Sequence, residues 1–425
     1  MLASDDPSDY GVPRAGARPR RPCAGQEPEE SEVTTRFDTS DVDRWVGVPT
    51  GGGQLKDPVG ANDIRRWVQG MQNPNPLYYD EAFAAESRFG RLVAPQSFCV
   101  CTSDSHGAGP AIQGSIPGTH MLFGGDEWWF HGPRIEPGDR ITLERMLFDY
   151  KVTETKFAGP TMFSRGDTTY INQRGQVVAK QRSTSIRYLA EEARRRGAFS
   201  ASKEPTWTED RLLEVEREKF EYYRTFLEIG HERRSIVKEG EKLPRRPIGP
   251  HTIQSFSTEW RAFLMSAWGA FRPDGGPSSL YQAGWLPEMA RDLEGAKIDP
   301  TLGDGLYHGP SRGHVQEKYA QLIGMPRGYG YGASMGSWVL DYLANWAGEW
   351  ADIVHSRMSY RSPALTGDVT YLDGEVERVD WSDPSGRPVA TVKVVMTNQL
   401  GDVMASGAAE LRMPTERLPE AEAGR

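Results

Sequence analysis

Residues that can exchange protons gather ahead of a glycine-rich turn in the second half of the chain. They are Asp304, His308, His314 and Glu317, and the turn ends at Gly332. A histidine titrates near neutral pH and suits proton transfer, whereas a glycine N–H at the start of a helix points toward developing negative charge. This combination suits acid–base chemistry beside a carbonyl group whose oxygen is held by the backbone.

Each of these residues also has a structural interpretation. His314 can be a structural histidine at a helix start, and His308 an exposed loop histidine. Asp304 and Glu317 can be solvated charges, which is the usual state of acidic residues. Gly332 can be a turn glycine that adopts a positive φ. The residue types alone leave these alternatives open.

Other chemistry-bearing patterns are weak. No Cys/His spacing matches a zinc site, and the turn at residues 328–332 lacks the preceding strand and the lysine of a phosphate-binding loop. Ser334 and Ser337 have no nucleophile elbow around them. We therefore predict that the chemistry uses no metal.

Composition excludes several function classes. The chain has 425 residues and a formal net charge of −9, which argues against a dedicated nucleic-acid surface. Three cysteines are too few for a disulfide framework, so a reducing cytoplasm is expected. The N-terminus lacks the apolar core of a signal peptide, and no stretch is long and apolar enough for a membrane span.

The elements that position these residues belong to a duplicated unit. Asn172-Gln173-Arg174-Gly175 recurs 226 residues later as Asn398-Gln399-Leu400-Gly401. Pro137-Gly138-Asp139 recurs in the same order as Thr366-Gly367-Asp368. A period of about half the chain indicates a copied domain, because solenoid repeats run roughly 20–50 residues. Function must then lie in what the two copies no longer share.

Each copy reads as helices followed by strands, which indicates an α+β fold. Helical spacing is found at 64–71, 81–89, 212–226 and 333–347, and strand-like alternation at 140–147, 162–172, 176–188, 368–379, 389–397 and 403–411. We expect a disordered extension at 1–35, a first domain at 36–190, a helical linker at 191–245, a second domain at 246–415 and a polar tail at 416–425.

Several of these segments resemble a known family. Residues 75–84, read with 89–95, resemble the hydratase motif Asp-x-Asn-Pro-Ile-His-x-Asp of the MaoC-like (R)-specific enoyl-CoA hydratases. Residues 124–130, 137–139 and 172–175 resemble the fatty-acid-synthase-type dehydratase branch of that family. The resemblance implies a double hot-dog fold, in which each half wraps a curved antiparallel sheet round one long helix and the halves pack as a pseudo-dimer. The central helices would begin near Pro95 and Gly332.

The resemblance also implies residue roles. The family's catalytic Asp and His fall on Asn73 and Tyr78 in the first half, and neither an amide nor a phenol is a base at neutral pH, so this half should be silent. In the second half the His position is His314, eighteen residues before Gly332, a spacing similar to the family's. The Asp position is occupied by Gly309, which leaves His308, Asp304 and Glu317 as candidates for the missing group.

Aromatic residues supply the expected acyl contacts. The resemblance implies an acyl tunnel reached from the silent half, and we expect Trp128, Trp129 and Tyr331 to bind substrate, although the tryptophans can equally be sheet core.

The implied function is that of a lyase that adds water reversibly to a 2-enoyl-CoA or a 2-enoyl-carrier-protein. Coenzyme A or phosphopantetheine would be part of the substrate, with no other cofactor, and an acyl carrier protein and a homodimer are possible partners. Nucleic acid and membrane are not expected as partners. Three alternatives stay open: conjugate addition of an amine, thioester hydrolysis by Asp341 or Glu317, and a non-catalytic acyl-binding subunit.

Overall fold

The computed structural model describes residues 37–55, 57–103, 107–197, 202–234, 237–269 and 312–415. The expected N-terminal extension, the polar tail and the two candidates Asp304 and His308 lie outside the described residues. The boundaries of the two domains and of the linker stay predictions.

The first repeat begins with short helices and ends with long strands. Its elements are α1 (Ser40–Asp43), β1 (Pro49–Gln54), α2 (Ala61–Gly70), η1 (Pro76–Tyr78), α3 (Glu81–Glu86), η2 (Gln96–Thr102), η4 (Gly109–Ile112), β2 (Thr119–Phe130), β3 (Ile141–Thr155), β4 (Gly159–Asn172), β5 (Val177–Leu189) and α4 (Ala190–Arg196).

The second repeat follows the same plan after a long helix. That helix is α5 (Glu209–Ile229), within the predicted linker. The elements after it are β6 (Arg246–Ile248), α6 (Ile253–Gly269), α8 (Arg312–Val315), α9 (Glu317–Leu322), α10 (Gly332–Ala347), β7 (Asp352–Tyr360), β8 (Thr370–Asp380), β9 (Val389–Asn398) and β10 (Val403–Arg412).

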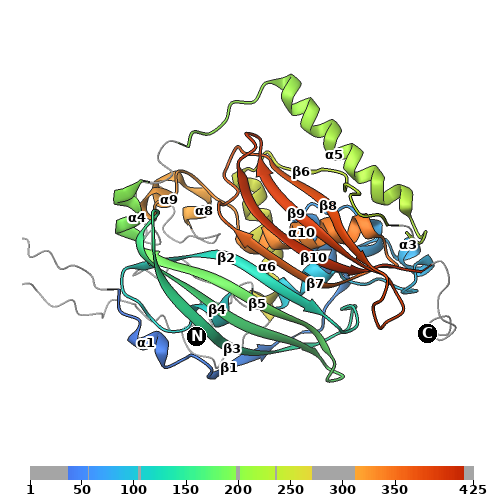
Figure 1. Ribbon diagram of the computed structural model, residues 1–425, viewed down its shortest axis with the longest axis horizontal. Helices are drawn as coiled ribbons and strands as arrows, with labels where there is room; N and C mark the ends of the chain where they lie inside the picture. Colours follow the sequence, from blue (N-terminus) through green and yellow to red (C-terminus); the bar gives the residue numbers. More distant parts are fainter. Residues whose placement is uncertain are drawn as a thin grey trace, which may run out of the picture. The chain divides into compact units, whose positions relative to one another are not determined.

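Within the described residues, ten strands form one antiparallel sheet in the order β1-β3-β4-β5-β2-β7-β10-β9-β8-β6. In each repeat the strands take the spatial order first, third, fourth, fifth, second, so the two halves are related as copies. They join where β2 pairs with β7, with Gly125 opposite Ser359 and Trp129 opposite His355. Figure 1 shows β2 and β7 side by side at this junction. The predicted α+β double hot-dog fold is confirmed.

The central helix of the second repeat is α10. Every residue of α10 except Gly332 and Ala344 is buried, which explains why its sequence is apolar around the whole circumference. Gly348 follows it with a φ of +77° and ends the helix. The prediction that this helix begins near Gly332 is confirmed.

The first repeat differs from the expectation at the same point. No α-helix begins near Pro95; the chain instead forms the 3-10 helix η2. Thr102 Oγ1 donates to the Cys99 carbonyl at 2.8 Å, and the Cys101 thiol contacts the Phe98 carbonyl at 3.2 Å. These short-range bonds engage carbonyl oxygens that the next turn of an α-helix would use. The predicted helix was therefore wrong for this half.

The duplicated turns make the same hydrogen bonds in both halves. The Asn172 side chain accepts from two backbone N–H groups in the β4–β5 turn, and the Asn398 side chain does the same in the β9–β10 turn. The glutamines that follow bind the preceding aspartates, Gln173 to Asp139 at 2.8 Å and Gln399 to Asp368 at 2.9 Å. The duplicated motif is therefore structural.

Candidate functional site

His314 lies on α8, against the glycine-rich turn that leads into α10. Its Nδ1 is 2.7 Å from the Tyr329 carbonyl oxygen. Because a carbonyl oxygen only accepts, Nδ1 must carry the proton, which leaves Nε2 with a free lone pair. Burial lowers the pKa of His314 to about 4, although the Tyr329 hydrogen bond opposes the shift. At neutral pH the imidazole is therefore an uncharged base with a fixed tautomer.

Tyr331 connects His314 to the start of α10. The His314 and Tyr331 rings lie 4.1 Å apart between centroids, and Tyr331 is the N-cap residue of the helix. Its carbonyl accepts from the N–H groups of Ser334 and Met335. For the Gly332 N–H, no hydrogen bond to any described residue is found. The structure thus brings His314, Tyr331 and Gly332 together, with a backbone donor at the positive end of a helix.

Glycine is required at position 332 by packing. A Cβ built on Gly332 would lie 2.5 Å from the Cβ of Phe123, on β2 of the other repeat. Gly332 is not among the residues with positive φ, so the turn-glycine interpretation is wrong. Close contact between the two repeats therefore keeps this helix start free of a side chain.

Two buried carboxyl groups flank the first turns of α10, and the sequence did not reveal either. Glu259 on α6 accepts from the Ser334 hydroxyl at 2.7 Å, and burial raises its pKa to about 8. Asp126 on β2 accepts from the Tyr360 hydroxyl at 2.9 Å and the Trp128 indole at 3.1 Å. Burial raises the pKa of Asp126 to about 6.

A second histidine approaches from β2. His120 packs its ring against Tyr188 at 5.9 Å. Burial lowers the pKa of His120 to about 4, and the nearby His314 contributes to the shift. Sequence reasoning missed this residue, because it stands in a different repeat from His314.

Of the two expected tryptophans, Trp128 meets this cluster through its hydrogen bond to Asp126, whereas Trp129 lies apart from it. Trp128 is buried in the core, stacked between Phe130 and Tyr170. Trp129 lies on the opposite face of β2, with its ring 5.5 Å from that of His355. Trp128 follows Phe123 by five residues, roughly 17 Å along a strand. Their substrate-binding role stays a prediction.

Glu317 begins α9 and bonds within that helix. Its carboxylate accepts from the Gln321 amide at 2.8 Å, and both side chains are on the surface. Asp304 and His308 lie outside the described residues, so no geometry bears on them.

In the first repeat, Asn73 at the catalytic Asp position belongs to a hydrogen-bonded network, and Tyr78 stands at the catalytic His position. Asn345 on α10 donates to the Asn73 side chain at 3.0 Å and to the Tyr222 hydroxyl at 3.2 Å, and accepts from Asn75 at 2.9 Å. Tyr78 is buried, and burial raises its pKa above the ordinary value. A proton-accepting group is thus lacking at both positions.

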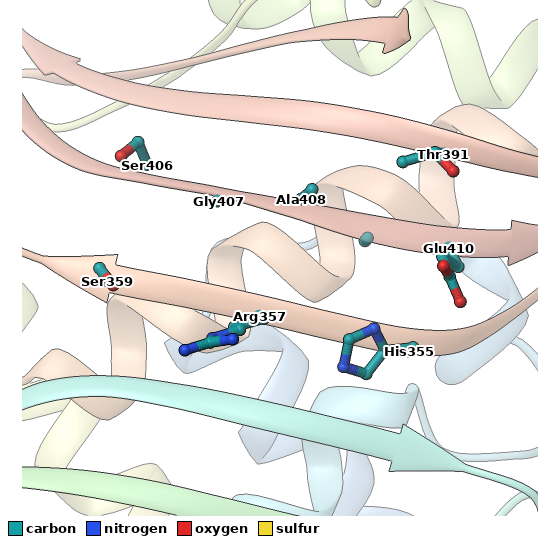
Figure 2. Close-up of a pocket in the computed structure, with 9 residues that line it drawn as sticks. His355, Arg357, Ser359, Thr391, Ser406, Gly407, Ala408 and Glu410 are labelled. Carbon is teal, nitrogen blue, oxygen red and sulfur yellow. The ribbon is translucent and has the colours of Figure 1, made fainter. Parts of the chain in front are cut away.

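A shallow groove lies on the outer face of the sheet. It has a volume of about 450 Å³ and is lined by residues of β7, β9 and β10. Figure 2 shows His355 and Arg357 projecting from β7 beside Ser406 and Glu410 of β10. His355 bonds Glu127 at 2.9 Å. This face is turned away from α10, so the groove is separate from the cluster around Gly332.

Two further observations concern the described part of the chain. It holds no group of three or more His, Cys, Asp or Glu side chains arranged to bind a metal ion. It also holds no helix with the length and apolar character needed to cross a membrane.

Comparison with known proteins bears on the same features. Residues 44–181 match the family model described as "FAS1-like, dehydratase domain region". Over 161 residues the chain is 31% identical to the "Probable enoyl-CoA hydratase alpha subunit" of Thermomonospora curvata, a match that covers 35% of this chain and 49% of that relative. The resemblance to the MaoC-like dehydratases is confirmed. The chain spans about half the length of this curated relative.

A solved structure of a MaoC-like dehydratase shares the fold. A structure titled "MaoC-like dehydratase" superposes with a TM-score of 0.57 at 16% identity, and the match covers 88% of this chain and all of that one. A putative MaoC domain protein from Chloroflexus aurantiacus gives a TM-score of 0.49 at 11% identity, covering 87% of this chain and 96% of that one. The first of these supports the MaoC-like double hot-dog architecture over both repeats.

Proposed function

We propose that this chain is an acyl-thioester dehydratase and enoyl hydratase whose active site lies in the second repeat. The substrate is a 2-enoyl or 3-hydroxyacyl thioester of coenzyme A or of a carrier protein. The thiol carrier is part of the substrate, and the chemistry calls for no separate cofactor. The observation that carries the proposal is the position of His314 beside the start of α10, with an Nε2 that has no hydrogen-bond partner among the described residues.

The two groups divide the chemistry. The Gly332 N–H, at the positive end of α10, binds the thioester oxygen as negative charge develops on it. His314 Nε2 takes the α-proton during dehydration and returns it during hydration. His314 therefore serves both directions of the reaction without changing its contacts to Tyr329.

Thioester hydrolysis has weaker support. It needs a carboxylate aimed at the carbonyl carbon, and the two candidates were Asp341 and Glu317. Glu317 is exposed and bonds within α9. Asp341 is nine residues after Gly332 on α10, roughly 13 Å along the helix. Its carboxylate accepts instead from Ser97 of η2 at 2.6 Å. The Asp341 carboxylate thus points toward the first repeat, away from the start of α10.

The test follows enoyl absorbance with crotonyl-CoA and a longer 2-enoyl-CoA, with and without glycine, for the wild-type protein and His314→Ala. We expect loss of absorbance in water alone, abolished in the variant. Loss that requires glycine would favour amine addition, and release of free coenzyme A would favour hydrolysis. If wild type and variant bind thioesters equally without turnover, the chain is an acyl-binding subunit.

A further inference from the structure

Glu259 is a buried carboxyl group with one oxygen unused. The side chain comes from α6 and is fully buried. Its Oε2 accepts from Ser334 in the first turn of α10, whereas its Oε1 is buried and has no hydrogen-bond partner among the described residues. Leaving a buried polar atom unpaired is costly. Such an atom beside a helix start suggests that a ligand completes its bonding.

The neighbours of Glu259 connect it to the site of His314. Phe263, one turn further along α6, packs against Tyr331 with ring centroids 5.5 Å apart. One turn earlier, Phe256 contacts the glycine-rich turn, since a Cβ added to Gly330 would lie 2.9 Å from its ring. Tyr331 in turn contacts His314. The face of α6 that carries Glu259 therefore packs on the same helix start that His314 approaches.

The first repeat has an apolar ring at the comparable place. There α2 presents Trp67, whose indole N–H donates to Ser97 of η2 at 3.0 Å. Both helices thus bond a serine near the start of a later helix of the same repeat, but only α6 does so with a carboxyl group. The carboxyl group that Ser97 bonds is Asp341, which comes from α10. The copies differ here as they do at Tyr78 and His314. Of these two helix positions, only the one in the repeat that keeps the histidine carries an acid–base residue.

We propose that Glu259 is the catalytic acid of the second-repeat site and supplies the carboxyl group that the sequence lacks at Gly309. This inference rests on the proposed function. It also explains how a chain with glycine at that position retains an acid–base pair, because the carboxyl group comes from α6.

The dehydration step then balances as follows. His314 Nε2 takes the proton from C2 of the 3-hydroxyacyl thioester, and the C2–H electron pair forms the C2–C3 double bond. The C3–O bond breaks, and the hydroxyl leaves as water with the proton of Glu259. The imidazolium and the carboxylate that remain exchange one proton through that water, which restores both groups. Hydration is the same sequence reversed.

The surroundings favour the protonated form of Glu259. The elements packed against α6 carry Asp63, Arg65 and Arg66 on α2, Cys99 and Cys101 on η2, and His314 on α8. Two effects shift the pKa of Glu259: burial raises it, and the hydrogen bond from the Ser334 hydroxyl lowers it by a smaller amount. The carboxyl group therefore holds its proton at neutral pH and loses it as the pH rises through about 8.

The experiment measures the pH dependence of enoyl-thioester turnover for wild type, Glu259→Gln, Ser334→Ala and the control Glu221→Gln. We expect Glu259→Gln to lower kcat by about 10²- to 10⁴-fold, the usual contribution of a general acid. Binding of butyryl-CoA, which cannot react, should be unchanged in this variant. Glu221 is an exposed residue of α5, so its variant should match wild type.

Ser334→Ala keeps the carboxyl group and removes the bond that lowers its pKa. The alkaline limb of the rate profile should therefore move to higher pH by about half a unit or more. If Glu259 had only a structural role, the alkaline limb would not move. Ser334→Ala therefore tests the catalytic role of Glu259 even if Glu259→Gln fails to fold.

The outcomes separate the two proposals. An active wild type whose Glu259→Gln variant keeps its turnover, or whose alkaline limb is unmoved in Ser334→Ala, overturns the role of Glu259 alone. Wild-type protein that binds enoyl thioesters without converting them overturns the proposed function, and the role of Glu259 with it.

Discussion

At the scale of single residues, burial shifts the two proposed acid–base groups in opposite directions. It lowers the pKa of His314 to about 4 and raises that of Glu259 to about 8. Between these values the histidine is an uncharged base and the carboxyl group keeps its proton, because each is held in its neutral form. This separation is the arrangement that dehydration needs, with an acceptor and a donor present together.

The same burial makes stability depend on pH. The folded-state pKa of Glu259 is above the ordinary value of 4.5, so its contribution to stability is complete below that value and is lost as the pH rises toward about 8. Glu259→Gln stays neutral throughout. The free energy of unfolding of the variant, relative to wild type, should therefore increase from pH about 5 to about 8. Chemical denaturation across this range measures it, with Glu221→Gln as the control. A difference that does not change with pH would contradict the shifted pKa.

Some residues of the proposed site could be predicted from the sequence. His314, Tyr331 and Gly332 were predicted and lie together, because the motif and its spacing are local. Glu259 and His120 were missed. Glu259 meets its partner Ser334 75 residues later, and His120 lies in the other repeat, so no local pattern links either to the site. The one signal for Glu259 was an acidic residue between Phe256 and Phe263 on a helix face.

At the scale of elements, the repeated turns were the most predictable feature. Their asparagine, glutamine and glycine form the same bonds in both copies, so short-range chemistry determines them. The long strands β3–β5 and β8–β10 were also predicted from alternation. The seam strands β2 and β7 were not, because Gly124 and Gly125 interrupt β2 and polar residues are mixed into β7. Tertiary pairing, which has no local signature, forms that seam.

The two turns should tolerate substitution equally poorly. Gly175 and Gly401 have φ values of +74° and +84°, and an added Cβ would meet nothing within 4 Å at either position. Alanine at each should therefore cost only the left-handed backbone strain, about 1–2 kcal/mol. Thermal or chemical unfolding of Gly175→Ala and Gly401→Ala measures this. Gly51→Ala, which has open space and no positive φ, should be neutral. Unequal costs in the two turns would argue against equivalent repeats.

At the scale of the whole molecule, the two repeats share one sheet and one core. A single cluster of buried apolar residues extends from Leu55 in the first repeat to Met413 in the second. The contact of Phe123 with Gly332 shows that one repeat also shapes the site of the other. The first repeat therefore contributes to the proposed active site by packing.

A shared core predicts shared unfolding. Because the apolar cluster is continuous across the β2–β7 junction, we expect residues of both repeats to unfold in one cooperative transition. Scanning calorimetry tests this through the ratio of calorimetric to van't Hoff enthalpy, which should be close to one. Two resolved transitions would mean that the repeats are independently stable domains.

The central claim is that turnover belongs to the second repeat, and a matched pair of variants tests it most directly. His314→Gln and Tyr78→Phe change the corresponding positions of the two repeats. In hydration of crotonyl-CoA, His314→Gln should lower kcat by about 10²- to 10⁴-fold, whereas Tyr78→Phe should stay close to wild type. A large loss of kcat in Tyr78→Phe, with His314→Gln unaffected, would place the active site in the first repeat and contradict the account.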